Sequence, residues 1–407
     1  MRRLAVLSLH SSPLIQPGSG DAGGMNVYVR ELVSSLAQAG VECVVYVRRW
    51  HDELPPVVDV EPGFRVVHVP AGPADLPKEA LPAIVDEFTD GVLDDIRASG
   101  DVDAIHANYW LSGVAGHRIK HELELPLVSI FHTLARVKAE TGDPEPQRRV
   151  DAEADVIRCS DVILANSRAE AQQLVGYYGA DSDRVQIVPP GVDHAFFSPG
   201  PKEGARDALG LGDHPVLLFV GRIQPLKGVD VAVRTLHELG DPTAMLLVVG
   251  GASGFGGAEE VERIHAMVDD LGLRDQVQFI PPQPHHELST YYRAADVCLV
   301  PSRSESFGLV ALEAAACGTP VVAAAVGGLR TLVEHGETGF LVDERDPAIY
   351  AQHVRDVLAS DELARSLSKA SVALASGYTW SITAARLRRI YADITSRTLV
   401  RCDGTTA

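Results

Sequence analysis

Positive charge, cysteine and long apolar runs are all scarce in this chain of 407 residues. Its 36 lysines and arginines are outnumbered by 55 aspartates and glutamates, which gives a formal net charge of −19. Such an acidic chain is not expected to bind nucleic acid or to adhere to an anionic membrane, and any phosphate-bearing ligand would need a local group of cations. No run of about 18 uncharged apolar residues occurs, so no transmembrane helix is expected.

The cysteines are few and irregularly spaced. Their number is odd, and their spacing matches no common metal-binding pattern. Both points favour reduced thiols, and therefore a cytoplasmic protein, over a disulfide framework. The five are Cys43, Cys159, Cys298, Cys317 and Cys402.

What the chain has in abundance is short apolar runs that alternate with helical patterns. Residues 4–9, Val216–Val220 and Val297–Val300 are runs of this kind, and hydrophobic residues make up 46% of the sequence. The alternation predicts an α/β protein with parallel sheets.

A cluster of prolines and glycines between Pro189 and Pro201 marks a linker. We therefore expect two doubly wound, Rossmann-like domains, residues 1–198 and 199–378, and a C-terminal segment, residues 379–407, whose helix returns to the first domain. Ligands of such sheets bind beyond the carboxyl ends of the strands, so the active site is expected in a cleft between the domains.

Two glutamates, Glu305 and Glu313, follow the apolar run Val297–Val300 with seven residues between them. Gly308 would let the backbone approach a ligand, and the helix expected there offers free N–H groups to an anion. We expect Glu313 to face a hydroxyl-bearing ring such as ribose, and Glu305 to lie near the transferred group. The alternative is a pair of solvated acids on a helix face.

Two cations, Arg222 and Lys227, lie five positions apart on the loop after Val216–Val220, where both can reach one diphosphate. They would neutralise a leaving pyrophosphate in place of a metal ion. A solvated basic loop is the alternative. The loop is not a Walker motif, because its glycines and hydroxyl residues are not spaced for one.

A loop with two adjacent glycines precedes the first expected helix. Its glycines would let the backbone approach the donor phosphates, and the helix N-terminus supplies positive potential. By itself this loop could equally be a tight turn. Its residues are Asp21, Ala22, Gly23, Gly24, Met25 and Asn26.

His132 follows the strand expected at residues 128–131. It would position the donor sugar and stabilise charge at the reacting carbon, unless it is an ordinary core histidine.

A second group of residues suits an anionic acceptor. Lys78 and Arg149 would provide the cations, and Tyr109 and Thr133 the hydroxyl groups. Spacing alone does not distinguish them from ordinary surface residues, and Arg148 is an alternative to Arg149. The whole group is His10, Asn26, Lys78, Tyr109, Thr133 and Arg149.

Taken together, these motifs resemble those of the retaining glycosyltransferases of the GT-B fold that carry a Glu-x7-Glu element. The resemblance extends from residue 4 to about residue 391. More narrowly, the chain resembles the actinobacterial D-inositol-3-phosphate glycosyltransferase family of mycothiol biosynthesis. The narrower match lies in residues 8–14, 16–18, 20–28, 109–113, 132–135 and 222–228.

The resemblance implies retaining transfer of N-acetylglucosamine from UDP-N-acetylglucosamine to 1D-myo-inositol 3-phosphate by a homodimer. The inositol phosphate would be held by Lys78, Tyr109, Thr133 and Arg149, and the inositol ring by His10 and residues 21–26. The donor would be held by Gln16, Pro17, Gly24, Arg222, Lys227, Glu305 and Glu313. The catalytic group would be His132, Arg222, Lys227 and Glu305.

The resemblance also associates a magnesium ion with Tyr292, Arg293, Ala295 and Thr319, although the chemistry requires no metal or other cofactor. Three alternatives stay open. One is a related glycosyltransferase that acts on another sugar phosphate or cyclitol. The others are a UDP-N-acetylglucosamine epimerase and a non-catalytic protein that binds nucleotide sugars.

Overall fold

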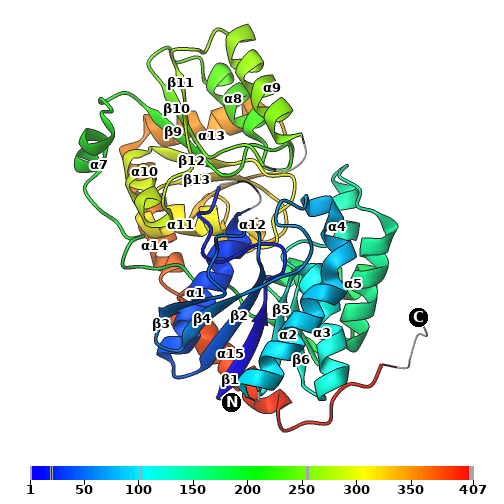
Figure 1. Cartoon of the computed structure of the whole chain (residues 1–407). Coiled ribbons are helices and arrows are strands. Elements are labelled where there is room, and N and C mark those ends of the chain that lie inside the picture. The colour runs from blue at the N-terminus through cyan, green and yellow to red at the C-terminus, as the bar shows by residue number, and fades with distance from the viewer. Residues whose placement is uncertain (1, 19, 21, 101, 254–255, 403–407) are drawn as a thin grey trace. The chain divides into compact units, whose positions relative to one another are not determined.

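The computed structural model describes residues 2–18, 20, 22–100, 102–253 and 256–402 (Figure 1). The chain forms two compact units. Unit 1 comprises Met1–Leu14, Met25–Pro189 and Trp380–Ala407, and unit 2 comprises Ile15–Gly24 and Pro190–Thr379. Each unit is built on a parallel or mainly parallel sheet with helices on both faces, as the alternating pattern predicted.

Unit 1 contains an eight-stranded sheet in the order β3-β4-β2-β1-β5-β6-β7-β8. Every neighbouring pair is parallel except β3 and β4, which form an antiparallel edge. The strands are β1 (Arg3–Leu7), β2 (Glu42–Arg48), β3 (Val57–Glu61), β4 (Phe64–Val69), β5 (Ala104–Asn108), β6 (Leu127–Ile130), β7 (Val162–Ala165) and β8 (Val185–Ile187).

Helices cover both faces of this sheet. The first helix presents Val29, Leu32 and Leu36 to one face, at helical spacing, and the last helix packs on the same face through Leu387 and Tyr391. The helices of unit 1 are α1 (Gly24–Gln38), η1 (Lys78–Ile84), α2 (Val85–Ser99), α3 (Tyr109–Leu123), α4 (Ala135–Glu140), α5 (Gln147–Cys159), α6 (Arg168–Tyr178) and α15 (Trp380–Ile394).

Unit 2 contains a six-stranded, all-parallel sheet in the order β11-β10-β9-β12-β13-β14. Because β9 and β12 are neighbours, the loops that follow them meet at one edge. The strands are β9 (Val216–Val220), β10 (Met245–Val249), β11 (Val277–Ile280), β12 (Val297–Val300), β13 (Val321–Ala324) and β14 (Gly339–Val342).

Two cores, one on each face, hold the helices of unit 2 against its sheet. These helices are α7 (Lys202–Leu209), α8 (Val229–Leu239), α9 (Gly257–Asp270), η2 (His285–Glu287), α10 (Leu288–Ala294), α11 (Leu309–Cys317), α12 (Leu329–Leu332), α13 (Pro347–Ala359) and α14 (Asp361–Ala375). None of the helices in the described ranges is both long and apolar enough to span a membrane.

The cysteines differ in one respect from the sequence-based expectation of five independent thiols. Cys43, Cys298 and Cys317 are free and buried. Cys159 and Cys402, however, are paired as for a disulfide, with their Cα atoms 5.3 Å apart, so the expectation of reduced thiols is wrong for this pair in the structure. A separation of 243 residues conceals this pairing in the sequence.

Candidate active site

The loops after β9 and β12 bring the predicted cation Lys227 and the predicted acid Glu305 together. The Lys227 Nζ and Glu305 Oε1 atoms lie 2.5 Å apart, and the Ser302 hydroxyl donates to the same carboxylate oxygen at 2.9 Å. The backbone N–H of Arg303 donates to the Leu226 carbonyl at 2.8 Å, which joins the two loops. A carboxylate therefore holds the lysine at the carboxyl edge of the sheet, where α/β proteins bind ligands.

Glycines determine the path of the Glu305 loop. Gly327 has a φ of +46°, and a Cβ atom there would lie 1.9 Å from the Glu305 carbonyl oxygen. The next amide, of Gly328, donates to that same oxygen at 2.9 Å. At Gly308 the φ is +107°, and a Cβ atom would lie 2.6 Å from the Leu329 side chain. The close approach observed at Gly308 is thus to Leu329, and it sets the start of α11.

Arg222 lies beside the glycine-rich loop of residues 15–24, which belongs to the same unit. Its guanidinium donates to the Ser253 hydroxyl at 3.1 Å, and a Cβ atom on Gly23 would lie 3.2 Å from its Nε. The Gln16 side chain donates to the Pro282 carbonyl at 2.8 Å. Two expected donor-site segments are therefore adjacent, and Ser253 and Pro282 are contacts that sequence spacing did not reveal.

The remaining residues of that loop differ in exposure. Gly24 is exposed at the first position of α1, Pro17 and Met25 are partly buried, and Ala22 is buried. Asp21 lies outside the described residues.

Glu313 is a buried acid rather than a solvated one, with 4% of its surface exposed. Its Oε1 lies 2.7 Å from the His285 Nε2, and its Oε2 accepts from the Tyr292 hydroxyl at 2.8 Å. Burial, and then the charge of Glu313, raise the pKa of Tyr292 far above its ordinary value, so the phenol stays protonated. Each carboxylate oxygen keeps a lone pair with which to accept a hydroxyl of a ligand.

The four residues associated with magnesium do come together, at the end of α10 and the start of β13. The Thr319 hydroxyl donates to the Tyr292 carbonyl at 2.6 Å, and the Ala295 amide donates to the same oxygen at 3.3 Å. The Arg293 guanidinium donates hydrogen bonds to the Ser198 and Phe196 carbonyls. This set offers no carboxylate, and both lone pairs of the Tyr292 carbonyl are engaged. It therefore fits a magnesium ion poorly.

In unit 1, two of the predicted residues have strained backbone conformations. Tyr109 has a φ of 75° and His132 a φ of 59°. Among the described residues only Glu124, which ends α3, is another non-glycine residue with positive φ. Tyr109 follows β5 and His132 follows β6, at the carboxyl edge of the sheet. Backbone strain of this kind persists only where the surrounding structure maintains it, and strained residues cluster at functional sites.

The environment of His132 keeps its imidazole neutral. Its Nε2 lies 3.1 Å from the Asn108 Oδ1, and the Tyr28 ring packs edge-on against it with centroids 4.9 Å apart. Burial, and then the proximity of His106, lower the pKa of His132 to about 3. With Nε2–H donating to Asn108, Nδ1 is left as an acceptor.

Arg149 is the centre of a buried polar network. It is 2% exposed, and its Nη2 donates to both the carbonyl and the hydroxyl oxygen of Thr133, at 2.9 and 3.1 Å. Glu153 and Glu145 flank its other nitrogens at 2.7 and 2.8 Å. The guanidinium also lies 4.9 Å from the centre of the Tyr109 ring. Two of the expected acceptor residues, Tyr109 and Thr133, therefore both contact a third, Arg149. The two glutamates were missed because ordinary acids carry no recognisable spacing.

The other residues of the acceptor group differ in their surroundings. The His10 ring packs on Tyr109 with centroids 4.3 Å apart. Lys78 is partly buried at the start of η1, and the exposed Arg148 donates to the carbonyl of the adjacent Glu79 at 3.1 Å. Asn26 is buried, and its side-chain amide donates hydrogen bonds to the Ser11 hydroxyl and the Ser12 carbonyl.

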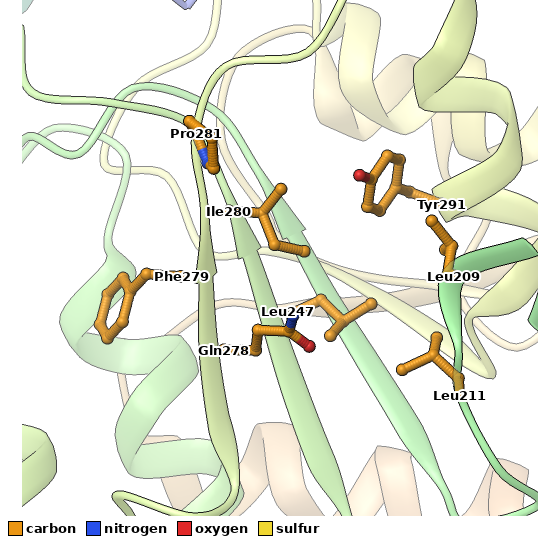
Figure 2. A pocket seen from close by; sticks show the side chains of 8 residues that line it. All are labelled: Leu209, Leu211, Leu247, Gln278, Phe279, Ile280, Pro281 and Tyr291. Carbon is orange, nitrogen blue, oxygen red and sulfur yellow. The ribbon is translucent and has the colours of Figure 1, made fainter.

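A pocket of ≈ 200 Å³ lies elsewhere in unit 2, against β10 and β11 (Figure 2). Most of its lining residues are of apolar types and none is a cation, so it is unsuited to a diphosphate. It contains none of the predicted site residues. It is lined by Leu209, Leu211, Leu247, Gln278, Phe279, Ile280, Pro281 and Tyr291.

Both units match known glycosyltransferase families. Residues 202–372 match the family described as glycosyl transferases group 1, and residues 22–196 match glycosyltransferase family 4. The D-inositol 3-phosphate glycosyltransferase of Xylanimonas cellulosilytica is 48% identical over 97% of this chain and 97% of its own. A protein of the same name from Acidothermus cellulolyticus is 47% identical over 96% of this chain and 90% of its own.

A solved structure agrees with this assignment. The sucrose-phosphate synthase of Thermosynechococcus elongatus superposes with a TM-score of 0.91 and 32% identity, over 97% of this chain and 99% of its own. The chain therefore belongs to the D-inositol 3-phosphate glycosyltransferase family and is a glycosyltransferase of the GT-B fold.

Proposed function

We propose that the protein transfers N-acetylglucosamine from UDP-N-acetylglucosamine to 1D-myo-inositol 3-phosphate and retains the anomeric configuration. The names of the relatives that are 45–48% identical over nearly the whole chain support the inositol phosphate acceptor and the glycosyl transfer. The donor UDP-N-acetylglucosamine is proposed from the family resemblance. The observation that carries the proposal is the meeting of Lys227 and Glu305 at the carboxyl edge of β9 and β12, on loops that contain the Arg222 and Glu-x7-Glu motifs.

Unit 2 is proposed to bind the donor. Arg222 and Lys227 supply the positive charge that a diphosphate needs on a chain with a net charge of −19. The first turn of α11 adds free backbone N–H groups. Glu313, which His285 and Tyr292 hold in place, would accept the ribose hydroxyls.

Unit 1 is proposed to bind the acceptor. Arg149 and Thr133 present polar groups already fixed by neighbours, so little conformational entropy is lost on binding. Glu145 and Glu153 balance the charge of Arg149, however. Additional positive charge must therefore attract the phosphate, and Lys78 is the residue proposed to supply it.

The proposed reaction needs no protein base. The acceptor hydroxyl attacks the anomeric carbon from the face that the diphosphate leaves, and its proton passes to the departing phosphate oxygen. Arg222 and Lys227 stabilise the charge that grows on that oxygen. A neutral His132 suits this chemistry, because a cationic imidazole would repel the positive charge that develops at the anomeric carbon. No step is assigned to magnesium, since the associated residues fit the ion poorly.

One assay tests the proposal against its rivals. The protein is incubated with UDP-N-acetylglucosamine, with and without inositol 3-phosphate, and the products are identified by mass and by proton spectra. We expect UDP and an α-linked N-acetylglucosaminyl-inositol phosphate only when the acceptor is present. Isomerised donor without acceptor would indicate an epimerase, and binding without turnover a non-catalytic protein. Transfer only to another cyclitol or sugar phosphate would refute the acceptor assignment.

Two further proposals come from the family resemblance: the enzyme acts as a homodimer, and it works in the cytoplasm. Sedimentation equilibrium tests the first and cell fractionation tests the second. A monomer that retains full activity, or recovery of the enzyme outside the cytoplasm, would refute the corresponding proposal.

A further inference from the structure

Four metal-ligating side chains of unit 1 converge at the surface formed by α3 and α5, and the mechanism above uses none of them. They are His117, His121, Cys159 and Cys402, and their donor atoms all lie within 4.8 Å of one another. We propose that they bind a zinc ion that fastens the C-terminal segment of the chain to α3 and α5.

Local structure places the first three ligands. His117 and His121 are four residues apart on α3, so they lie on one face of the helix, with ring centroids 4.9 Å apart. Cys159 is the last residue of α5, which packs on α3. The Lys120 ammonium donates to the Cys159 carbonyl at 2.8 Å and fixes the end of α5 beside the two histidines.

The fourth ligand, Cys402, lies near the C-terminal end of the sequence. After α15 the chain continues, in red in Figure 1, towards α3 and α5. The Val400 amide donates to the Asp161 Oδ1 at 2.7 Å, while the Asp161 Oδ2 accepts from Lys120 at 2.7 Å. The hydrogen bond from Val400, two residues before Cys402, holds the Cys402 thiol beside the two histidines.

The nitrogen–sulfur distances suit tetrahedral zinc. With Zn–S bonds of about 2.3 Å and Zn–N bonds of about 2.05 Å, neighbouring nitrogen and sulfur ligands are separated by about 3.6 Å. The Cys159 and Cys402 sulfur atoms are in contact in the structure, and they would move to about 3.8 Å apart to bind the ion. The Cys402 Sγ lies 3.6 Å from the His117 Nε2 and 3.3 Å from the His121 Nε2, and the Cys159 Sγ lies 3.5 Å from the His121 Nε2.

The donor types select the metal. Two thiolates and two imidazoles form a common set for structural zinc, and the thiolates neutralise the charge of the ion. Cys159 is buried and His121 is exposed, so an ion can enter from the solvent side. A disulfide between Cys159 and Cys402 would involve only two of the four groups. It would not explain why both histidines also contact the sulfur atoms.

Metal content tests the proposal directly. The full chain is purified with a phosphine reductant, and its zinc is measured by plasma mass spectrometry. We expect one zinc per chain in the wild type, and less than about a tenth of that in Cys402→Ser and in His121→Ala, since loss of one ligand from a four-ligand site removes most of its affinity. Matched controls are Cys317→Ala, a buried free thiol, and His335→Asn, an exposed histidine of unit 2; both should keep their zinc.

Cobalt substitution supplies a spectroscopic readout. The wild type should show the intense visible bands of tetrahedral cobalt and a thiolate charge-transfer band, and Cys402→Ser should lose both. UDP binding by unit 2 should persist in Cys402→Ser, which shows that the variant is folded. Zinc content that does not change in Cys402→Ser would overturn the proposal. So would a zinc-free wild type, or freshly isolated protein in which Cys159 and Cys402 are oxidised to each other.

Discussion

Replacing Lys227 with alanine should abolish most of the catalysis while leaving the fold intact. The lysine side chain is 24% exposed, and it pairs with a Glu305 side chain that is 15% exposed. The pair is partly buried, but the Ser302 hydroxyl still donates to the carboxylate that remains, so the loss of stability should be only about 1 kcal/mol and the midpoint of thermal unfolding should move little. The loss of one preorganised donor to the leaving group should instead lower kcat by about 10²–10³, or roughly 2.7–4 kcal/mol.

The assay measures UDP release at saturating acceptor, together with UDP affinity by calorimetry. Lys202→Ala is the matched control, because Lys202 also pairs with an acid, Asp296, on the surface of unit 2, away from the predicted site. We expect wild-type turnover from the control. Turnover of Lys227→Ala within a few-fold of the control would refute the role of the lysine in stabilising the leaving diphosphate.

A companion variant separates the two partners of this pair. Glu305→Gln removes the charge that holds Lys227 but keeps the lysine. If Glu305 only orients Lys227, UDP should bind as tightly as before, or more tightly, because the ligand no longer competes with a carboxylate. Weaker UDP binding would instead indicate that Glu305 itself contacts the donor.

Three further predictions concern the acceptor, the loop and pH. Lys78→Ala should lower kcat/KM for inositol 3-phosphate about 10- to 100-fold, since hydrogen bonds to charged groups contribute about 1.5–3 kcal/mol; an equal loss of UDP affinity in calorimetry would contradict the acceptor assignment. Gly327→Ala should displace Glu305, because its Cβ would lie 1.9 Å from the Glu305 carbonyl oxygen, and turnover equal to the wild type would disprove this. Burial lowers the pKa of His106 to about 3. The unfolded chain therefore binds a proton that the folded chain does not, and stability decreases as the pH falls through about 6.5. Between about pH 7 and pH 5 the wild type should lose roughly 2 kcal/mol more than His106→Asn in urea unfolding, and identical losses would refute this.

Much of the fold could be predicted from local pattern alone. Apolar runs such as Val216–Val220 and Val297–Val300 are strands in the structure, and the first expected helix is present as α1, which buries Val29, Leu32 and Leu36. The antiparallel edge of β3 and β4, and the three-residue β8, were not predicted. The residues of β3 are partly buried or exposed, and most residues of β8 are exposed. Neither β3 nor β8 therefore has the continuous run of apolar residues that is typical of a buried parallel strand.

Local sequence was enough to predict the alternation of strand and helix. It also placed Arg222 and Lys227 on one loop, and Glu305 and Glu313 around the start of one helix. These depend on side-chain periodicity and backbone sterics within a few residues. Which loops lie next to each other could not be predicted in this way, because that depends on how the strands are ordered in each sheet.

Strand order, rather than spacing, joins Lys227 to Glu305 and gathers Thr133 and Tyr109 around Arg149. In the same way, the packing of α5 on α3 and the docking of the C-terminal segment unite two histidines with cysteines 243 residues apart. Long-range contacts of this kind follow from the burial of whole faces of sheets and helices, and no short stretch of sequence encodes that burial.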